Sequence, residues 1–95
     1  MSYAITVLPA VEGQRWVCVE GRVDVLSAGD VRALLSVAIH DLPTRSLTVD
    51  LRRAEVTDDA GRRSLTEAAA LAATAGVTWR VLERADTASL ALAAG

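Results

Sequence analysis

The sequence of 95 residues contains no phenylalanine and no lysine, and it has one cysteine and two prolines. Its three aromatic residues are Tyr3, Trp16 and Trp79, so the core must be built mostly from valine, leucine, isoleucine and alanine. The single cysteine, Cys18, excludes an internal disulfide, and its place in an apolar run predicts a small buried side chain. No apolar run approaches the length of a membrane span, so we expect no direct membrane insertion.

Charge of one sign is not in excess either. Ten basic residues, all arginine, face twelve acidic ones, and a net charge of −2 argues against a general nucleic-acid or anionic-membrane binder. The first residues lack the basic and apolar regions of a signal peptide, so we expect a cytoplasmic protein. A hydrophobic content of 52% argues against disorder, and the length predicts a single domain over residues 1–95.

The first part of the chain predicts a β-hairpin. Alternating apolar residues over 3–10 indicate a strand that ends near Pro9, and a glycine-containing turn leads to the β-prone run over 16–21. Because so short a loop joins them, the two strands should be antiparallel. Trp16 and Cys18 alternate with their neighbouring valines, so one of these two pairs should point to an open sheet face.

A helix should follow this hairpin. Ser27 is a good N-cap residue, and Asp30 completes a pattern that resembles a capping box. Pro43 should end the helix. Apolar residues at spacings of three and four predict one buried helical face, formed by Val31, Leu34, Leu35, Ala38, Ile39 and Leu42.

The second half of the chain predicts alternating strands and helices. Residues 46–51 alternate as a strand with a single buried face, and an alanine-rich helix should end at Gly76. Residues 77–82 read as another strand, and a last short helix should begin near Asp86 or Thr87. The order β-β-α-β-α-β-α predicts an α/β fold, a small mixed sheet of four to five strands with its helices mainly on one face.

Three stretches occur in a distinctive order. In the first stretch, residues 19–35, the segment Gly-Arg-Val-Asp ends at Asp24, shortly before Ser27 and a helix. In the second, residues 47–61, a strand that ends in Asp-Leu is joined to the segment Asp-Asp-Ala-Gly. The third, residues 72–82, contains the end of a helix and the start of a strand. This set resembles the STAS domain, the fold of bacterial anti-sigma-factor antagonists. The likeness spans roughly residues 3 to 83.

The resemblance implies a regulatory protein that binds a partner and has no enzymatic activity or cofactor. The family carries an Asp-Ser-Ser-Gly signature, and Gly61 stands at the position of its glycine, called here the signature glycine. The implied partner is an anti-sigma factor or a related histidine-kinase-like protein, which in the family often phosphorylates the serine before this glycine. That position is Ala60 in this chain, and Asp59 replaces the serine before it, so the usual switch should be absent. The residues implied to bind the partner are Asp24, Thr57, Asp58, Asp59, Ala60, Gly61 and Arg62.

The acidic pair has two interpretations. Asp58 and Asp59 could cap the following helix, or Asp59 could imitate a phosphorylated state with its single charge. Gly61 should permit a tight turn or a close backbone approach. Four arginines near this junction, namely Arg52, Arg53, Arg62 and Arg63, could form an anion site or a solvated rim.

Other functional classes remain as alternatives. A stand-alone STAS protein could instead be an accessory subunit that binds the ATPase of a lipid-trafficking ABC transporter, or a small domain that binds an anion or nucleotide. A homodimer through the open sheet face is compatible with each. The serines, His40 and Cys18 form no recognisable catalytic arrangement, and the sequence has no metal-ligand cluster and no Walker or Rossmann glycine pattern.

Overall fold

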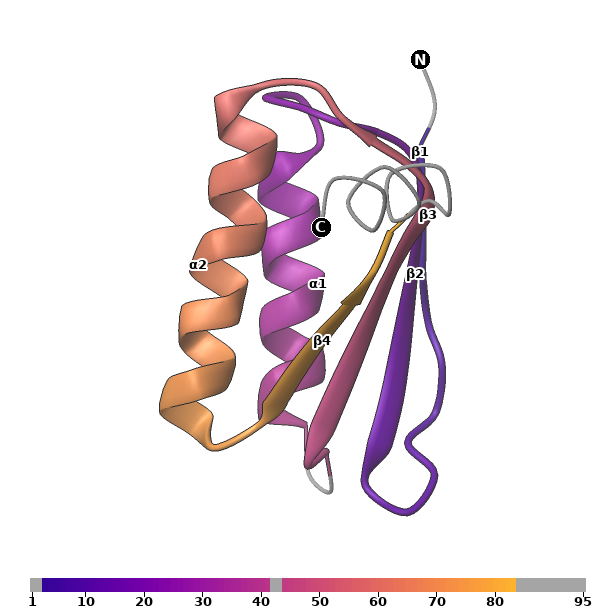
Figure 1. Cartoon of the computed structure of the whole chain (residues 1–95), viewed down its shortest axis with the longest axis vertical. Coiled ribbons are helices and arrows are strands. Elements are labelled where there is room, and N and C mark those ends of the chain that lie inside the picture. Colours follow the sequence, from indigo (N-terminus) through magenta and orange to yellow (C-terminus); the bar gives the residue numbers. More distant parts are fainter. Residues whose placement is uncertain (1–2, 42–43, 84–95) are drawn as a thin grey trace, which may run out of the picture.

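The computed structural model describes residues 3–41 and 44–83. Its elements are β1 (Tyr3–Val7), β2 (Gln14–Val23), α1 (Ala28–His40), β3 (Ser46–Val56), α2 (Asp59–Ala75) and β4 (Thr78–Leu82), as Figure 1 shows. The predicted α/β class and the order of these six elements are confirmed. The predicted last helix, Leu42 and Pro43 lie outside the described residues.

The described strands form one mixed sheet of four, in the order β1-β2-β3-β4. The predicted hairpin is confirmed, because β1 pairs antiparallel with β2. Its turn places Glu12 and Gly13 at positive φ angles of 53° and 81°. The β2–β3 and β3–β4 pairs are parallel, so β2, β3 and β4 all run toward the same end of the sheet. The loops that leave β2 and β3 therefore meet at that end (Figure 1).

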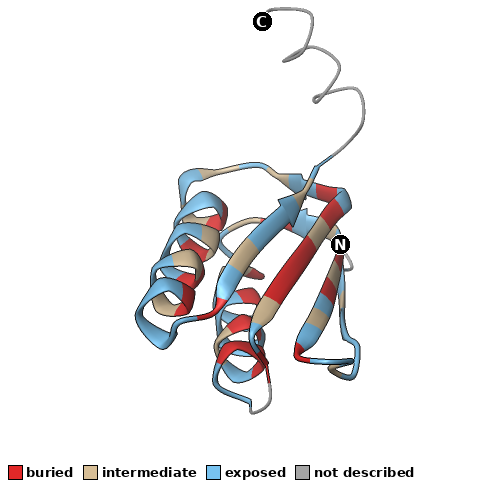
Figure 2. Ribbon diagram, turned by 60° about the horizontal axis from the view of Figure 1, so that its bottom comes forward, coloured by how far each residue is buried: buried red, intermediate tan, exposed pale blue. Residues whose placement is uncertain are grey.

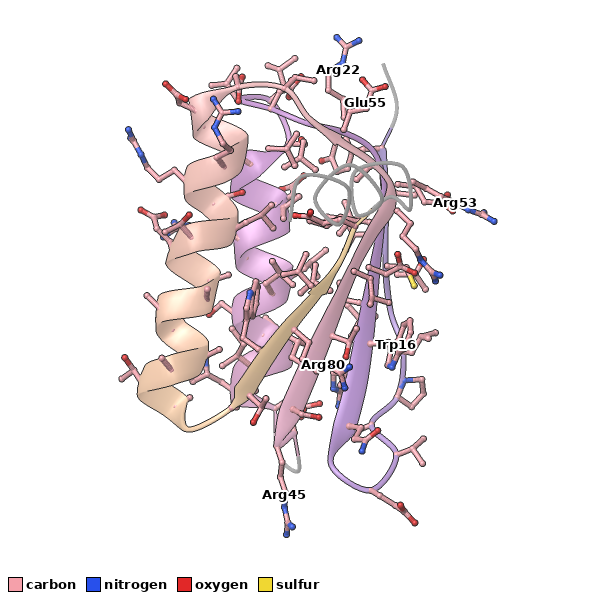
Figure 3. The ribbon with its side chains drawn as sticks, in the orientation of Figure 1. Trp16, Arg22, Arg45, Arg53, Glu55 and Arg80 are labelled. Atoms are coloured by element: carbon pink, nitrogen blue, oxygen red, sulfur yellow. The ribbon has the colours of Figure 1, made fainter. Side chains whose placement is uncertain are left out.

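Both helices cover the same face of the sheet (Figures 1 and 2). Val17 and Val19 of β2 are fully buried on this side, whereas Trp16 points away from the helices (Figure 3). The prediction that one of the two alternating pairs faces an open side is confirmed. The buried apolar core consists of Val17, Val19, Val23, Val31, Leu35, Ala38, Ile39, Leu47, Val49, Leu51, Ala54, Ala68, Ala72 and Val77.

Three predictions of burial were wrong. Leu34, assigned to the buried face of α1, is exposed, because it lies at the edge of that face. Cys18 is only partly buried, since it lies on the open face of the sheet. Thr48 is buried although it lies on the same open face, because β3 is a central strand and Thr48 sits in register between Trp16 and Arg80.

β3 is longer than predicted, because Arg52 and Arg53 belong to the strand and not to a loop. Cys18 pairs with Asp50, but Glu20 pairs with Arg53, so two residues of β3 lie opposite the single residue between them on β2. This β-bulge places both arginines on the open face and returns the buried Ala54 to the helix side, from where the alternation of the strand resumes. Two adjacent polar residues had obscured the alternation of the strand.

The end of α2 follows the predicted glycine cap. Gly76 adopts a left-handed conformation with φ of 75°, and its N–H donates to the carbonyls of Ala72 and Ala73. Gly76 therefore ends the helix directly before β4, in agreement with the prediction. Within the described ranges, no helix is long and apolar enough to cross a membrane.

Candidate functional site

Asp58 joins the two loops that meet at the end of the sheet. One carboxylate oxygen accepts a hydrogen bond from the Gly61 N–H at 2.8 Å, so Asp58 is the N-cap of α2. The other oxygen accepts a bond from the Val25 N–H at 3.0 Å, in the loop between β2 and α1. The Thr57 N–H also donates to the Val23 carbonyl at 3.2 Å. One side chain thus caps a helix and holds a neighbouring loop.

Gly61 lies where the start of α2 approaches the end of β2 closely. A Cβ atom at this position would lie 2.3 Å from the Val23 carbonyl oxygen and 2.9 Å from its carbon. Backbone atoms cannot move aside as the end of a flexible side chain can, so only glycine fits here without a shift. The expectation of a close backbone approach at Gly61 is confirmed.

The loop from Asp24 to Ser27 is tied to itself by hydrogen bonds. The Asp24 carboxylate accepts from the N–H groups of Leu26, at 2.9 Å, and Ser27, at 3.3 Å. The buried Ser27 hydroxyl accepts from the Asp24 N–H at 3.1 Å and donates to the Arg22 carbonyl at 2.7 Å. Asp24 therefore shapes this loop from within.

The predicted capping box at α1 was wrong. Ser27 occupies the N-cap position, but its side chain makes no capping hydrogen bond because its hydroxyl points back to the end of β2. Asp30 instead accepts a hydrogen bond from the Tyr3 hydroxyl, which raises the pKa of that hydroxyl above its ordinary value. The first turn of α1 is therefore connected to β1.

These bonds hold two apolar side chains in water. Val25 is 69% exposed and Leu26 is 84% exposed, on a loop whose N–H groups bind Asp58 and Asp24. An ordered loop whose apolar side chains remain exposed to solvent is typical of a binding surface. Neither residue belongs to the motifs recognised in the sequence. The sequence feature that could have identified them is that this apolar pair fits neither the alternation of the preceding strand nor the periodicity of the following helix.

A shallow groove of about 320 Å³ separates the first turns of α1 and α2. Ala60 lines this groove opposite Gly29, where a Cβ atom would meet nothing within 4 Å. Arg32 reaches Glu67 across it at 3.8 Å. The full lining is Ala28, Gly29, Arg32, Ala60, Arg63, Ser64 and Glu67. The position before the signature glycine therefore faces open space between two helix N-termini.

The four arginines singled out in the sequence do not converge. Arg52 and Arg53 line a hollow on the open sheet face, Arg63 lines the groove between the helices, and Arg62 borders another hollow beside β4. Arg62 pairs with Asp59, and this hydrogen bond lowers the pKa of the Asp59 carboxyl. The charge of Asp59 is therefore partly neutralised by Arg62 of the same helix.

Two hydroxyls next to the signature glycine have different environments. Ser64 is buried, and its Oγ donates to the Gly61 carbonyl at 2.7 Å. Thr57 is exposed, just before the N-cap. No group of three or more side chains among the described residues could hold a metal ion. The groups gathered here can position a loop and a helix for contact with another protein.

Comparisons of the sequence with protein-family models and with curated proteins find no match. Solved structures with the same fold are found. An antisigma-factor antagonist STAS domain from Rhodobacter sphaeroides is 21% identical with a TM-score of 0.72, covering 84% of this chain and 85% of its own. An anti-sigma factor antagonist from Mycobacterium paratuberculosis is 20% identical with a TM-score of 0.75, covering 98% and 79%. Unphosphorylated SpoIIAA, an anti-sigma factor antagonist, is 15% identical with a TM-score of 0.69, covering 97% and 84%. This chain therefore has the fold of STAS domains, as its sequence motifs had implied.

Proposed function

We propose that this protein is a regulatory module that acts by binding another protein and carries out no reaction of its own. The proposed partner is an anti-sigma factor or a related histidine-kinase-like protein. The observation that carries this proposal is the loop with Val25 and Leu26, two apolar side chains held in water by hydrogen bonds to Asp24 and Asp58. The structural neighbours named as anti-sigma-factor antagonists support the class of partner.

The proposed contact surface extends from this loop into the groove between the helices. Thr57, Asp59 and Arg62 are exposed beside it, and Ala60 lines the groove itself. Apolar side chains at the centre of a contact and charged ones around it are a common arrangement of protein interfaces. Asp24, Asp58 and Gly61 act mainly by shaping this surface.

Binding through this surface should not be controlled by phosphorylation of the residue before Gly61. Ala60 has no hydroxyl there, and Ser64 is buried with its hydroxyl bonded to a carbonyl. We therefore propose a complex that forms constitutively or is regulated by another means, such as the amount of either protein.

The test compares two valines of equal exposure. Val25 and Val11 are each 69% exposed, but Val11 belongs to the turn between β1 and β2. Figure 1 shows this turn at the opposite end of the molecule from the loop between β2 and α1. Wild type and the variants Val25→Asp and Val11→Asp would be used to capture partners, which mass spectrometry would identify. An anti-sigma factor or histidine-kinase-like protein should be captured by wild type and Val11→Asp and lost with Val25→Asp.

A different outcome would support the second candidate. Capture of an ABC transporter ATPase would favour an accessory subunit, which needs no phosphorylated serine and is therefore also compatible with Ala60. Equal capture by both variants would refute the proposed surface. A binding site for a free anion built from all four arginines is not favoured, because they line three separate hollows.

A further inference from the structure

The open face of the sheet carries side chains in ordered rows across the strands. Trp16 of β2, Thr48 of β3 and Arg80 of β4 are in register and form one row. Trp16 is 37% exposed although it is one of only three aromatic residues in the sequence. Within the described residues, no helix packs on this face (Figures 1 and 3).

The next rows carry charges that are opposite between β2 and β3. Glu20 pairs in register with Arg53, and Arg22 pairs with Glu55. Between these two rows the signs alternate both across the strands and along them, from Glu20 to Arg22 on β2 and from Arg53 to Glu55 on β3. The Glu20–Arg53 ion pair measures 3.2 Å, and the Arg53 side chain is 82% exposed. This arginine can therefore reach a second carboxylate above the sheet.

Such a pattern is complementary to itself. A twofold axis parallel to the strands and midway between β2 and β3 would place each β2 residue against the β3 residue of the same row in a second copy. Glu20 would then face the second copy's Arg53, Arg22 would face its Glu55, and Trp16 would cover its Thr48. The two charged pairs that this symmetry brings face to face, Glu20 with Arg53 and Arg22 with Glu55, are both attractive.

We propose that two copies of this chain associate face to face through the open sheet. The interface would be isologous, as twofold dimers require. Two sheets can pack in this way with their strands roughly aligned. A stable interface buries about 800 Å² per partner, which is about one eighth of the 6062 Å² surface of the described chain.

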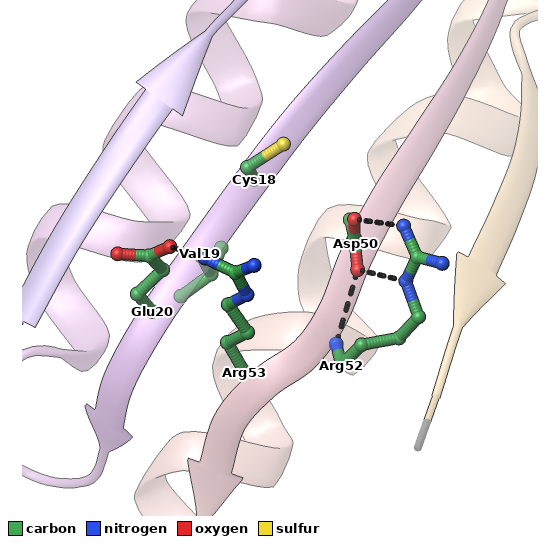
Figure 4. A pocket seen from close by; sticks show the side chains of 6 residues that line it. All are labelled: Cys18, Val19, Glu20, Asp50, Arg52 and Arg53. Carbon is green, nitrogen blue, oxygen red and sulfur yellow. Dashed lines mark hydrogen bonds and ion pairs between the residues drawn. The ribbon is translucent and has the colours of Figure 1, made fainter. Parts of the chain in front are cut away.

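A hollow on this face would receive part of the second copy. It has a volume of about 450 Å³ and is lined by Cys18, Val19, Glu20, Asp50, Arg52 and Arg53 (Figure 4). The Arg52 guanidinium is held by Asp50 at 2.8 and 3.0 Å, which leaves space between this pair and the Glu20–Arg53 pair. The exposed Arg53 of a second copy is long enough to reach the Glu20 carboxylate at the edge of this hollow.

This dimer would leave the proposed partner surface free. The groove between α1 and α2 belongs to the helix layer, which lies on the other side of the sheet (Figure 1). One dimer could therefore present two partner-binding surfaces facing away from each other. Bivalent presentation would strengthen binding to a dimeric partner without any new contact.

Charge reversal and mixing test the proposal. The twofold axis repeats each contact, so a dimer of Glu20→Arg contains two repulsive contacts between the introduced arginine and Arg53 of the other copy. A dimer of Arg53→Glu contains two repulsive contacts between the introduced carboxylate and Glu20 of the other copy. Analytical ultracentrifugation should show a monomer–dimer equilibrium for wild type, weakened at least about tenfold in each variant. In an equal mixture of the two variants both contacts between positions 20 and 53 are attractive again, so a heterodimer should form.

The mixture separates the interface from a structural effect. Both variants lose the Glu20–Arg53 pair within one chain, so mixing cannot restore a fold damaged by that loss. Circular dichroism would verify that each variant is folded, and Arg45→Glu, whose side chain points away from the sheet end (Figure 3), should dimerise as wild type does. A wild type that stays monomeric at its highest soluble concentration, or a mixture without heterodimer, would overturn the proposal.

Discussion

The Asp58 carboxylate accepts a hydrogen bond from the Val25 backbone N–H at 3.0 Å, across 33 positions of sequence. Its other oxygen caps α2 through Gly61. The conformation of the exposed loop between β2 and α1 is thereby coupled to the start of α2. A change at Asp58 should consequently affect both.

Replacing Asp58 with alanine should destabilise the protein by about 1–2 kcal/mol, because both hydrogen bonds are lost. For a domain of this size the melting temperature should fall by roughly 5–10 °C. Hydrogen exchange at the Val25 amide should also accelerate. Asp58→Asn can still accept one bond and should lose less. Asp59→Ala, at a neighbouring carboxylate that pairs with the exposed Arg62, serves as the control and should melt close to wild type. Unchanged exchange at Val25 in Asp58→Ala would contradict this role.

Two helical glycines should respond to alanine in opposite directions. Gly61→Ala forces a methyl group against the Val23 carbonyl and should cost about 1–3 kcal/mol of unfolding free energy. Gly29→Ala fills open space in the first turns of α1 and should stabilise by about 0.5–1 kcal/mol. Urea denaturation of both variants measures the difference. Equal effects at the two positions would show that α2 can shift away from β2.

Acid should remove the contribution of the Asp50–Arg52 pair. The hydrogen bond from Arg52 holds the pKa of the Asp50 carboxyl below its ordinary value. A carboxyl with a lowered pKa stabilises the folded state above the unfolded pKa of about 3.9 and loses that effect as the pH falls through the folded pKa. The stability difference between wild type and Arg52→Ala should therefore be constant near neutral pH and shrink below about pH 4. Urea denaturation across this range measures it, and a difference that persists at the lowest pH would argue that Arg52 acts through packing.

Ala60→Ser should supply the missing phosphoacceptor, if the captured partner is a kinase. The new hydroxyl would lie in the first turn of α2, where a phosphate is favoured by the helix dipole. Intact-mass measurement after incubation with the kinase and ATP should show one phosphoryl adduct on the variant and none on wild type. An adduct on wild type that disappears in Thr57→Val would reveal a different acceptor and a retained switch.

The sequence predicted those parts of the fold that depend on local periodicity. Alternation identified the hairpin, and Gly76 marked the end of α2 correctly. The predicted strand ended at residue 51, before the end of β3 at Val56. The adjacent Arg52 and Arg53 contradict the alternation of a strand unless a bulge is present, and a bulge depends on the register with β2. Ser27 was assigned a capping bond because its residue type favours one, yet a nearby carbonyl of β2 competed for its hydroxyl.

The candidate site was predictable only in part. Asp58 and Gly61 were recognisable because a cap and a close approach require particular residue types at a helix start. Val25 and Leu26 were not, because their exposure results from hydrogen bonds between segments far apart in sequence. For the same reason, the separation of the four arginines into three hollows required the folded arrangement of β3 and α2.

The bulge in β3 also determines where this chain can change its length. Arg52 and Arg53 share one side of the sheet, so removal of one of them would leave a regular strand in which Leu51 and Ala54 still face the helices. The start of α2 would keep its position relative to β2. Tolerance to a deletion is usually a property of surface loops. Here the bulge predicts the same tolerance in a central strand.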